Sequence, residues 1–102
     1  MMYHYSIWQR PLIDPKTFRP INDGVDEVFL GEYVHVYDWE TDNKEGLEDI
    51  YERFNINHPT DYHARSLSVS DLIYIRDKEK NEEYGYLVDM IGFKKVNVST
   101  SR

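Results

Sequence analysis

The sequence of 102 residues contains no cysteine. This absence excludes disulfide bonds, thiol nucleophiles and metal sites built from thiolates. The sequence also has no apolar run of the ~18 residues that a membrane-spanning helix needs. It has no basic excess, since 12 lysines and arginines stand against 19 aspartates and glutamates. The resulting net charge of −7 argues against a broad nucleic-acid footprint, because phosphate binding needs clustered basic side chains.

The N-terminal residues lack the basic and apolar stretches of a signal peptide. No repeat and no Gly/Ser-rich linker divides the chain. We therefore expect a cytosolic protein that binds no membrane and whose residues 1–102 form a single domain. Aromatic residues make up 15% of the chain, and such a content of large apolar groups excludes a disordered protein.

Alternating apolar and polar residues predict strands at Tyr3–Gln9 and within Val28–Trp39. Trp8 interrupts the first alternation, and Gly31 in the second segment indicates a bulge or a turn between two short strands. The segment Pro11–Gly24 between them contains three prolines. Because each proline removes a backbone donor and fixes φ, we expect a long irregular surface connection there.

Helical periodicity follows residue 42. Asp42 with Glu45 three residues later is typical of a capping box, in which each side chain satisfies an unpaired backbone donor. Apolar residues then recur at helical spacing, at Leu47, Ile50, Tyr51 and Phe54. The pattern predicts one amphipathic helix over residues 43–55, ended by the approach to Pro59.

The last third of the chain predicts three strands, at Leu72–Arg76, Tyr84–Met90 and Phe93–Val98, with a charged turn between the first two. A single helix provides too few crossovers for a parallel sheet, so the strands should pair antiparallel. The predicted fold class is therefore α+β, with a curled antiparallel sheet of about five strands packed on one main α-helix.

Several segments match a known pattern: a strand ending in Trp8–Gln9, a helix running into Phe54–Asn55, a serine-rich block at Arg65–Asp71, and the segments Tyr84–Asp89 and Gly92–Val96. In these features the chain resembles the YodL-like family of small bacterial proteins. Similar sequences usually have glycine directly before the aspartate of the serine block, where this chain has Ser70. A residue with a side chain disfavours the left-handed turn that glycine allows.

The resemblance implies a free-standing domain, or a module of a larger protein, carried by phages or conjugative elements. Proteins of this kind offer no established catalytic residues that could be transferred to this chain. An accessory role acting on a component of the bacterial host is the natural expectation. We therefore expect no enzymatic activity and no cofactor.

Three aromatic residues, Trp8, Tyr37 and Trp39, are candidates for binding a host protein, because Trp and Tyr are enriched at interface hot spots. They belong to stripes at strand spacing, most of which should pack in the core. In the second strand region, the alternation places four residues on one face, namely Tyr33, His35, Tyr37 and Trp39.

The serine block supplies further binding candidates, Arg65, Ser68 and Asp71. The block has no G-x-S-x-G elbow and no glycine near its serines, which argues against a serine hydrolase. Its serine and aspartate side chains are expected to bond nearby backbone donors, so that Asp71 fixes the start of the strand at Leu72.

His58, Asp61 and His63 could bind Zn²⁺, Fe²⁺ or Mn²⁺ if their loop curled to bring them together. No local secondary structure enforces that arrangement, and we favour an ordinary structural loop, hence no metal.

These observations favour a non-catalytic module that binds a host protein. The alternatives are a small nucleic-acid-binding domain or, less favoured, a metal-dependent hydrolase. A nucleic-acid partner is disfavoured because the basic residues form only one small grouping, Lys94 and Lys95 with Arg65 and Arg76. A homodimer could form if Tyr3–Gln9 were an unpaired edge strand.

Overall fold

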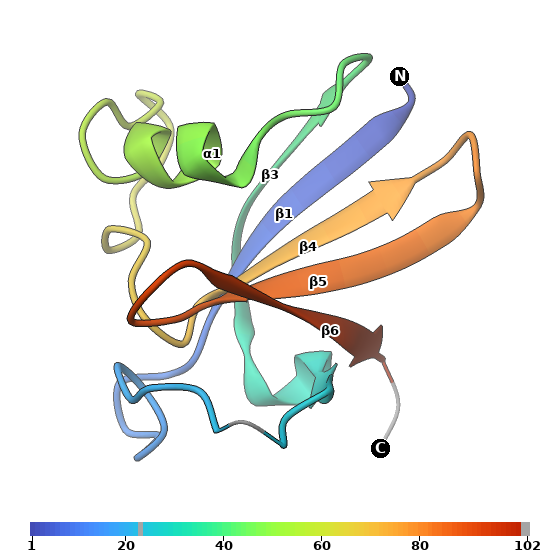
Figure 1. Cartoon of the computed structure of the whole chain (residues 1–102). Helices are drawn as coiled ribbons and strands as arrows, with labels where there is room; N and C mark the ends of the chain where they lie inside the picture. Colours follow the sequence, from blue (N-terminus) through green and yellow to red (C-terminus); the bar gives the residue numbers. More distant parts are fainter. Residues whose placement is uncertain (23, 101–102) are drawn as a thin grey trace.

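The structure, a computed structural model, describes residues 1–22 and 24–100. The fold is α+β, with one six-stranded mixed sheet and a short helix packed on one of its faces (Figure 1). The elements are β1 (Tyr3–Gln9), β2 (Glu27–Phe29), the 3₁₀ helix η1 (Leu30–Glu32), β3 (Val34–Thr41), α1 (Leu47–Arg53), β4 (Leu72–Asp77), β5 (Glu82–Val88) and β6 (Phe93–Ser99).

The strands are arranged in the order β2-β6-β5-β4-β1-β3. All pairs are antiparallel except β2–β6, which is parallel. The predicted curled sheet packed on a helix is confirmed, and so is the meander of its last three strands. Gly31 lies in η1, between β2 and β3, which confirms the turn between two strands that the sequence indicated there.

The N-terminal strand β1 lies inside the sheet, paired with β3 on one side and with β4 on the other. Tyr3–Gln9 therefore offers no open edge to a second copy of the chain, and β3 is the long edge strand. On β3, Asp38 contacts His4 Nε2 at 3.0 Å, and Glu40 contacts Lys78 Nζ at 2.7 Å. Charged side chains on an edge strand disfavour further strand pairing.

Two hydrophobic cores form on opposite faces of the sheet, because successive residues of a strand point to opposite sides. In β4, Ile73 and Ile75 join the core beneath α1, whereas Leu72 and Tyr74 join the second core. We call the first the helix-side core; its buried members are Tyr5, Ile7, Ile50, Phe54, Tyr62, Leu67, Ile73, Ile75 and Val88. The second, the loop-side core, consists of Val28, Tyr33, Leu72, Tyr74, Leu87 and Val96.

A β-bulge separates the two halves of the β1–β3 pair. Ile7 lies opposite Tyr37 but Trp8 lies opposite His35, so Val36 is an extra residue on β3. Because an extra residue shifts the alternation by one, side chains before and after it point to faces opposite to those that strict alternation would give. Tyr33 accordingly joins the loop-side core, while Tyr37 packs on the helix-side core.

The prediction that Tyr33, His35, Tyr37 and Trp39 share one face was therefore wrong. The disruption that Trp8 introduces into the sequence pattern coincides with the bulge.

The helix α1 is shorter than predicted and lacks the expected capping box. Its N-cap is Gly46, which makes no side-chain capping bond. The carboxylate of Glu45 is occupied instead by the Trp39 indole N–H at 2.7 Å and by the Arg53 guanidinium. Ile50 is fully buried, as the apolar stripe predicted.

Ser70 adopts the left-handed backbone conformation, with φ of 82°. A left-handed conformation that glycine would adopt without strain is thus adopted here by serine. The Ser70 N–H donates to Val88 O at 2.9 Å, and its Oγ accepts the Phe18 N–H at 3.1 Å. These two bonds hold the strained residue between β5 and the long connection.

The predicted Pro11–Gly24 connection is irregular, as expected, and runs as a series of turns. Position 23 lies outside the described residues. Ile21 and Val25 pack against the loop-side core, so the connection covers the sheet face opposite α1 (Figure 1). Among the described residues, no helix combines the length and the apolar composition needed to cross a membrane.

Gly85, in the middle of β5, leaves no room for a side chain. A Cβ there would lie 2.8 Å from Leu72 Cδ1 and 2.8 Å from Val98 Cγ2. We expect Gly85→Ala to lower the free energy of unfolding by about 1–3 kcal/mol through overpacking, measured by urea denaturation. Gly31→Ala is the control, because nothing lies within 4 Å of its Cβ position. Equal stability of the two variants would contradict this packing.

The strain at Ser70 can be separated from its hydrogen bond by two substitutions. Ser70→Ala loses the bond to Phe18 and keeps the left-handed strain, which should lower the free energy of unfolding by about 1 kcal/mol. Ser70→Gly loses the same bond but relieves the strain, so it should be about 1–2 kcal/mol more stable than Ser70→Ala. Urea denaturation of both variants tests this, and an alanine variant as stable as the glycine variant would rule out strain.

Candidate functional site

The three aromatic candidates do not form one surface. Trp8 lies on the loop-side face, where its indole N–H donates to Ser6 Oγ at 2.8 Å and its ring meets the His35 ring edge-on at 5.0 Å. Tyr37 and Trp39 pack on the opposite face, against the helix-side core. Tyr37 lies opposite Ile7, and Trp8 is the next residue of β1, so strand alternation alone turns Trp8 to the other face.

Tyr37 and Trp39 are part of an aromatic cluster beneath α1. The Trp39 ring stacks on Tyr5 with centroids 5.3 Å apart, and both candidates contact the buried Phe54 ring. The Tyr37 hydroxyl donates to Asp61 Oδ1 at 2.8 Å. These contacts give both side chains a packing role that needs no partner protein.

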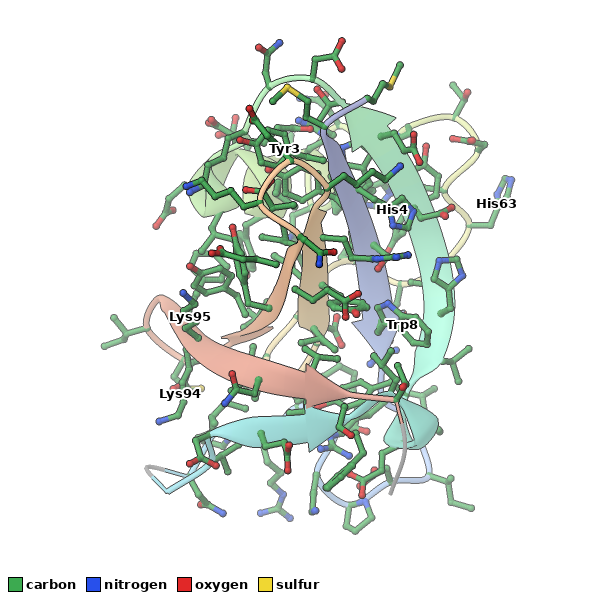
Figure 2. The ribbon with its side chains drawn as sticks, turned by 90° about the vertical axis from the view of Figure 1, so that its right-hand side faces the viewer. Tyr3, His4, Trp8, His63, Lys94 and Lys95 are labelled. Atoms are coloured by element: carbon green, nitrogen blue, oxygen red, sulfur yellow. The ribbon has the colours of Figure 1, made fainter. Side chains whose placement is uncertain are left out.

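The structure does not gather His58, Asp61 and His63 into a metal site. His58 packs against the Tyr62 ring at 5.1 Å, and Asp61 accepts the Tyr37 hydroxyl. His63 projects outward from its loop (Figure 2). Within residues 1–22 and 24–100, no three His, Cys, Asp or Glu side chains are placed to share a metal ion.

The basic grouping is also dispersed. Lys94 and Lys95 lie on β6, on the side of the molecule away from His63 (Figure 2), and Lys95 sits over the Tyr84 ring. Arg76 pairs with Glu83 at 3.4 Å. The fourth member, Arg65, is occupied in an internal network.

The binding candidates Arg65, Ser68 and Asp71 are brought together, in a network of internal hydrogen bonds. Asp71 Oδ2 accepts the Ser68 backbone N–H at 2.8 Å, and its Oδ1 accepts Arg65 Nη2 at 3.1 Å. The carboxylate thus closes a short turn directly before β4 begins at Leu72, as the sequence indicated. Its side chain is 0% exposed.

Two further members of this network were not predicted, Gln9 and Tyr62. The Gln9 amide donates to Asp71 Oδ2 and to Arg65 O, both at 3.0 Å, and its Oε1 accepts Arg65 Nη1 at 3.0 Å. The Tyr62 hydroxyl donates to Arg65 O at 2.5 Å. Nothing in the local pattern distinguishes a glutamine that ends a strand in solvent from one that is buried there.

Burial dominates the electrostatics of the network. It raises the pKa of Asp71 to about 6, against the opposing effects of the Ser68 N–H, Arg65 and Gln9. Burial and the nearby Asp71 charge raise the pKa of Tyr62 to about 12. A carboxylate enclosed in this way links segments that are distant in the sequence, and a substrate in solution has no access to it.

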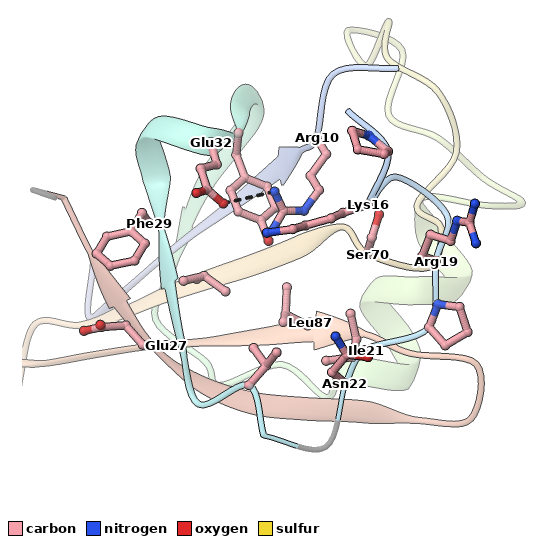
Figure 3. A pocket seen from close by; sticks show the side chains of 15 residues that line it. Arg10, Lys16, Arg19, Ile21, Asn22, Glu27, Phe29, Glu32, Ser70 and Leu87 are labelled. Atoms are coloured by element: carbon pink, nitrogen blue, oxygen red, sulfur yellow. Dashed lines mark hydrogen bonds and ion pairs between the residues drawn. The ribbon is translucent and has the colours of Figure 1, made fainter. Parts of the chain in front are cut away.

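A second feature, which the sequence did not reveal, is a cavity of about 610 Å³ on the loop-side face (Figure 3). We call it the loop-side cavity. Its walls come from the segment between β1 and β2, which we call the connection 10–26, from the segment of β2, η1 and Tyr33, and from Ser70 and β5. Its lining residues are Arg10, Pro15, Lys16, Arg19, Pro20, Ile21, Asn22, Val25, Glu27, Val28, Phe29, Glu32, Tyr33, Ser70 and Leu87.

Arg10 organises one wall of this cavity. Its Nη1 contacts Asp14 Oδ2 at 3.0 Å and Glu32 Oε1 at 3.2 Å, and its guanidinium lies 4.5 Å from the centre of the Tyr33 ring. The Tyr33 side chain is only 7% exposed, and its hydroxyl has no hydrogen-bond partner among the described residues. Burial raises the pKa of this hydroxyl, so it stays protonated and able to donate.

A third feature is a set of exposed apolar side chains on two neighbouring connections. We call it the end surface; its members are Leu12, Ile13, Phe18, Met90 and Ile91. The connection 10–26 and the β5–β6 turn that carry them are joined by a bond from the Ile21 N–H to Asp89 Oδ1 at 3.2 Å.

A comparison with family models finds a match over residues 6–98, to the family described as YodL-like domain. No curated protein and no solved structure matches the chain.

The raised pKa of Asp71 predicts how stability depends on pH. Between the unfolded pKa of about 4 and the folded pKa of about 6, the folded protein binds the extra proton, so stability falls as the pH rises. We expect the free energy of unfolding to be about 1 kcal/mol lower at pH 7 than at pH 5. Asp14 and Glu40, whose pKa values are lowered, act below this window.

Urea denaturation at several pH values measures this dependence, and Asp71→Asn should remove it. Titration of the Asp71 carboxyl carbon by NMR gives the same quantity in the unaltered protein. An identical pH slope in the wild type and in Asp71→Asn would contradict the assignment.

Proposed function

The chain belongs to the YodL-like domain family, and we propose that it is a non-catalytic module that binds another protein. Its role would be that of an accessory protein of a phage or mobile element, acting on a protein in the cytoplasm of the bacterial host. The observation that carries the proposal is the end surface.

The end surface exposes apolar area that the fold does not use. Ile13 is 93% exposed and Ile91 is 95% exposed. Neither residue belongs to the helix-side or the loop-side core. Single exposed apolar residues are ordinary, but several on adjoining connections are typical of interaction sites.

The placement of these side chains also favours a shared contact. The connection 10–26 and the β5–β6 turn lie at the same end of the sheet, on the left of the view in Figure 1. Phe18 is held there by the bond from its N–H to Ser70 Oγ and by the Arg65 guanidinium, which lies 5.0 Å from its ring centre. A pre-positioned apolar surface loses less entropy on binding than a disordered one.

The charge of the chain adds a property of the partner. A net charge of −7 favours encounter with a partner of positive net charge, because complementary charge steers association.

The internal network supports the non-catalytic part of the proposal. Asp71 is the described carboxyl group whose pKa is raised, which is a property of many general acids. Its side chain is fully buried, and its two oxygens already accept bonds from Ser68, Gln9 and Arg65. Asp71 therefore has a structural role as a buried hydrogen-bond acceptor.

The test is affinity capture from bacterial lysate, with and without nuclease, using Ile13→Asp and Ile91→Asp. Each should reduce the recovery of a captured protein at least tenfold, because a charge in an apolar contact is strongly unfavourable. The matched control is Ile56→Asp, an isoleucine that is 71% exposed on the turn after α1. Thermal unfolding would show that all three variants stay folded.

The proposal predicts one protein that is recovered equally by the wild type and by Ile56→Asp, whether or not nuclease is present. Loss of recovery with nuclease would indicate nucleic-acid binding instead. Equal recovery by all variants, no recovery at all, or self-association of the wild type that Ile91→Asp abolishes in sedimentation would each overturn a host-protein contact at this surface.

A further inference from the structure

The loop-side cavity carries an inference that is independent of the end surface. We propose that it is a binding site for a small ligand with an anionic group and an apolar body. The proposal depends on the size of the cavity, on an unpaired hydroxyl in its wall and on the distribution of charge around it.

The size of the cavity fits a small molecule. Its volume of about 610 Å³ lies within the range of about 300–1,000 Å³ that ligand pockets occupy. Val28 and Leu87 of the loop-side core form apolar lining, and Ile21 and Val25 of the connection add to it. An apolar lining of this kind favours a ligand that has a hydrocarbon or ring portion.

The Tyr33 hydroxyl supplies a specific polar contact. It is buried and makes no hydrogen bond of regular geometry within the described part of the chain, although the neighbouring Arg10 guanidinium acts to lower its pKa. Arg10 can only donate, so the hydrogen of the hydroxyl still lacks an acceptor, which buried polar groups in native proteins almost always have. Its ring is fixed by the Arg10 guanidinium, which is itself held by Asp14 and Glu32. A fixed, protonated hydroxyl whose hydrogen lacks an acceptor can donate that hydrogen to an acceptor atom of a ligand.

The charges around the cavity favour an anion on one side. The connection contributes Arg10, Lys16 and Arg19, which Figure 3 shows on the side away from Glu27 of β2. Arg10 is already paired, but neither Lys16 nor Arg19 forms an ion pair with any residue the structure describes. Three basic residues against two acidic ones line this cavity, in a protein whose total charge is −7.

These features assign each part of the ligand a place. The anionic group would lie beside Lys16 and Arg19, the apolar body over Val28 and Leu87, and an acceptor atom near the Tyr33 hydroxyl. A carboxylate and a phosphate monoester share this chemistry, so the first probe must separate charge from apolar character.

The experiment is calorimetric titration of the full chain with three probes. Octanoate has both properties, octanol has only the apolar body, and inorganic phosphate has only the charge. We expect octanoate to bind at one site per chain, at least tenfold more tightly than either of the others. An affinity for octanol equal to that for octanoate would indicate an unspecific apolar cavity. An affinity for phosphate equal to that for octanoate would indicate a simple anion site, and either result would overturn the proposal.

Two sets of variants locate the site. Lys16→Ala combined with Arg19→Ala should weaken octanoate binding at least fivefold, whereas Lys44→Ala combined with Lys80→Ala, which changes the net charge equally, should leave it unaltered. Equal losses in the two double variants would place the anion outside the cavity. Ile91→Asp should bind octanoate as the wild type does, which separates this site from the end surface.

Tyr33→Phe gives a second, independent signature. Removing an unpaired buried hydroxyl should raise the thermal unfolding midpoint of the ligand-free protein, because the folded state no longer buries an unsatisfied donor. The same substitution should weaken octanoate binding about three- to tenfold, the loss expected for one hydrogen bond. A variant that binds octanoate as tightly as the wild type would overturn the role of Tyr33.

Discussion

The burial of one carboxylate, that of Asp71, determines how the irregular parts of this protein are attached to its sheet. The side chain is 0% exposed and receives donors from the turn at Ser68, from Arg65 and from the end of β1 at Gln9. Burial raises its pKa to about 6, so the charged form is less favourable there than in water. Removing the carboxylate would nevertheless leave several donors buried without an acceptor. Such unsatisfied donors typically destabilise the folded state more than the burial of the carboxylate does.

This arrangement places the connection 10–26. The chain leaves β1 at Gln9, inside the network, and Arg65 continues it by contacting Arg10 O at 3.2 Å and the Phe18 ring. Ser70, the residue directly before Asp71, accepts the Phe18 N–H. The same connection then forms the wall of the loop-side cavity and much of the end surface. Both proposed sites therefore depend on one internal anchor, although they differ in chemistry.

The elements that could be predicted from sequence are those whose pattern is local. The apolar run from Leu72 to Ile75 and the stripe containing Ile50 identified a strand and a helix, and the serine block correctly indicated a turn before Leu72. The capping box failed because Glu45 has stronger partners in Trp39 and Arg53, which are distant in the pattern. The cavity could not be predicted, because Arg10, Tyr33 and Leu87 meet only through the order of the strands.

The β-bulge at Val36 has a consequence for how this chain can vary in length. Because one extra residue there separates Tyr33 from Tyr37, each of the two cores receives the tyrosine that fits it. Loss of a single residue from this stretch would turn one of the two tyrosines toward the wrong side of the sheet. The stretch should therefore tolerate exchange of side chains far better than a change in their number. The β4–β5 turn, whose four residues 78–81 are exposed, is better suited to insertions, provided that the bonds of Lys78 to Met2 and Glu40 are kept.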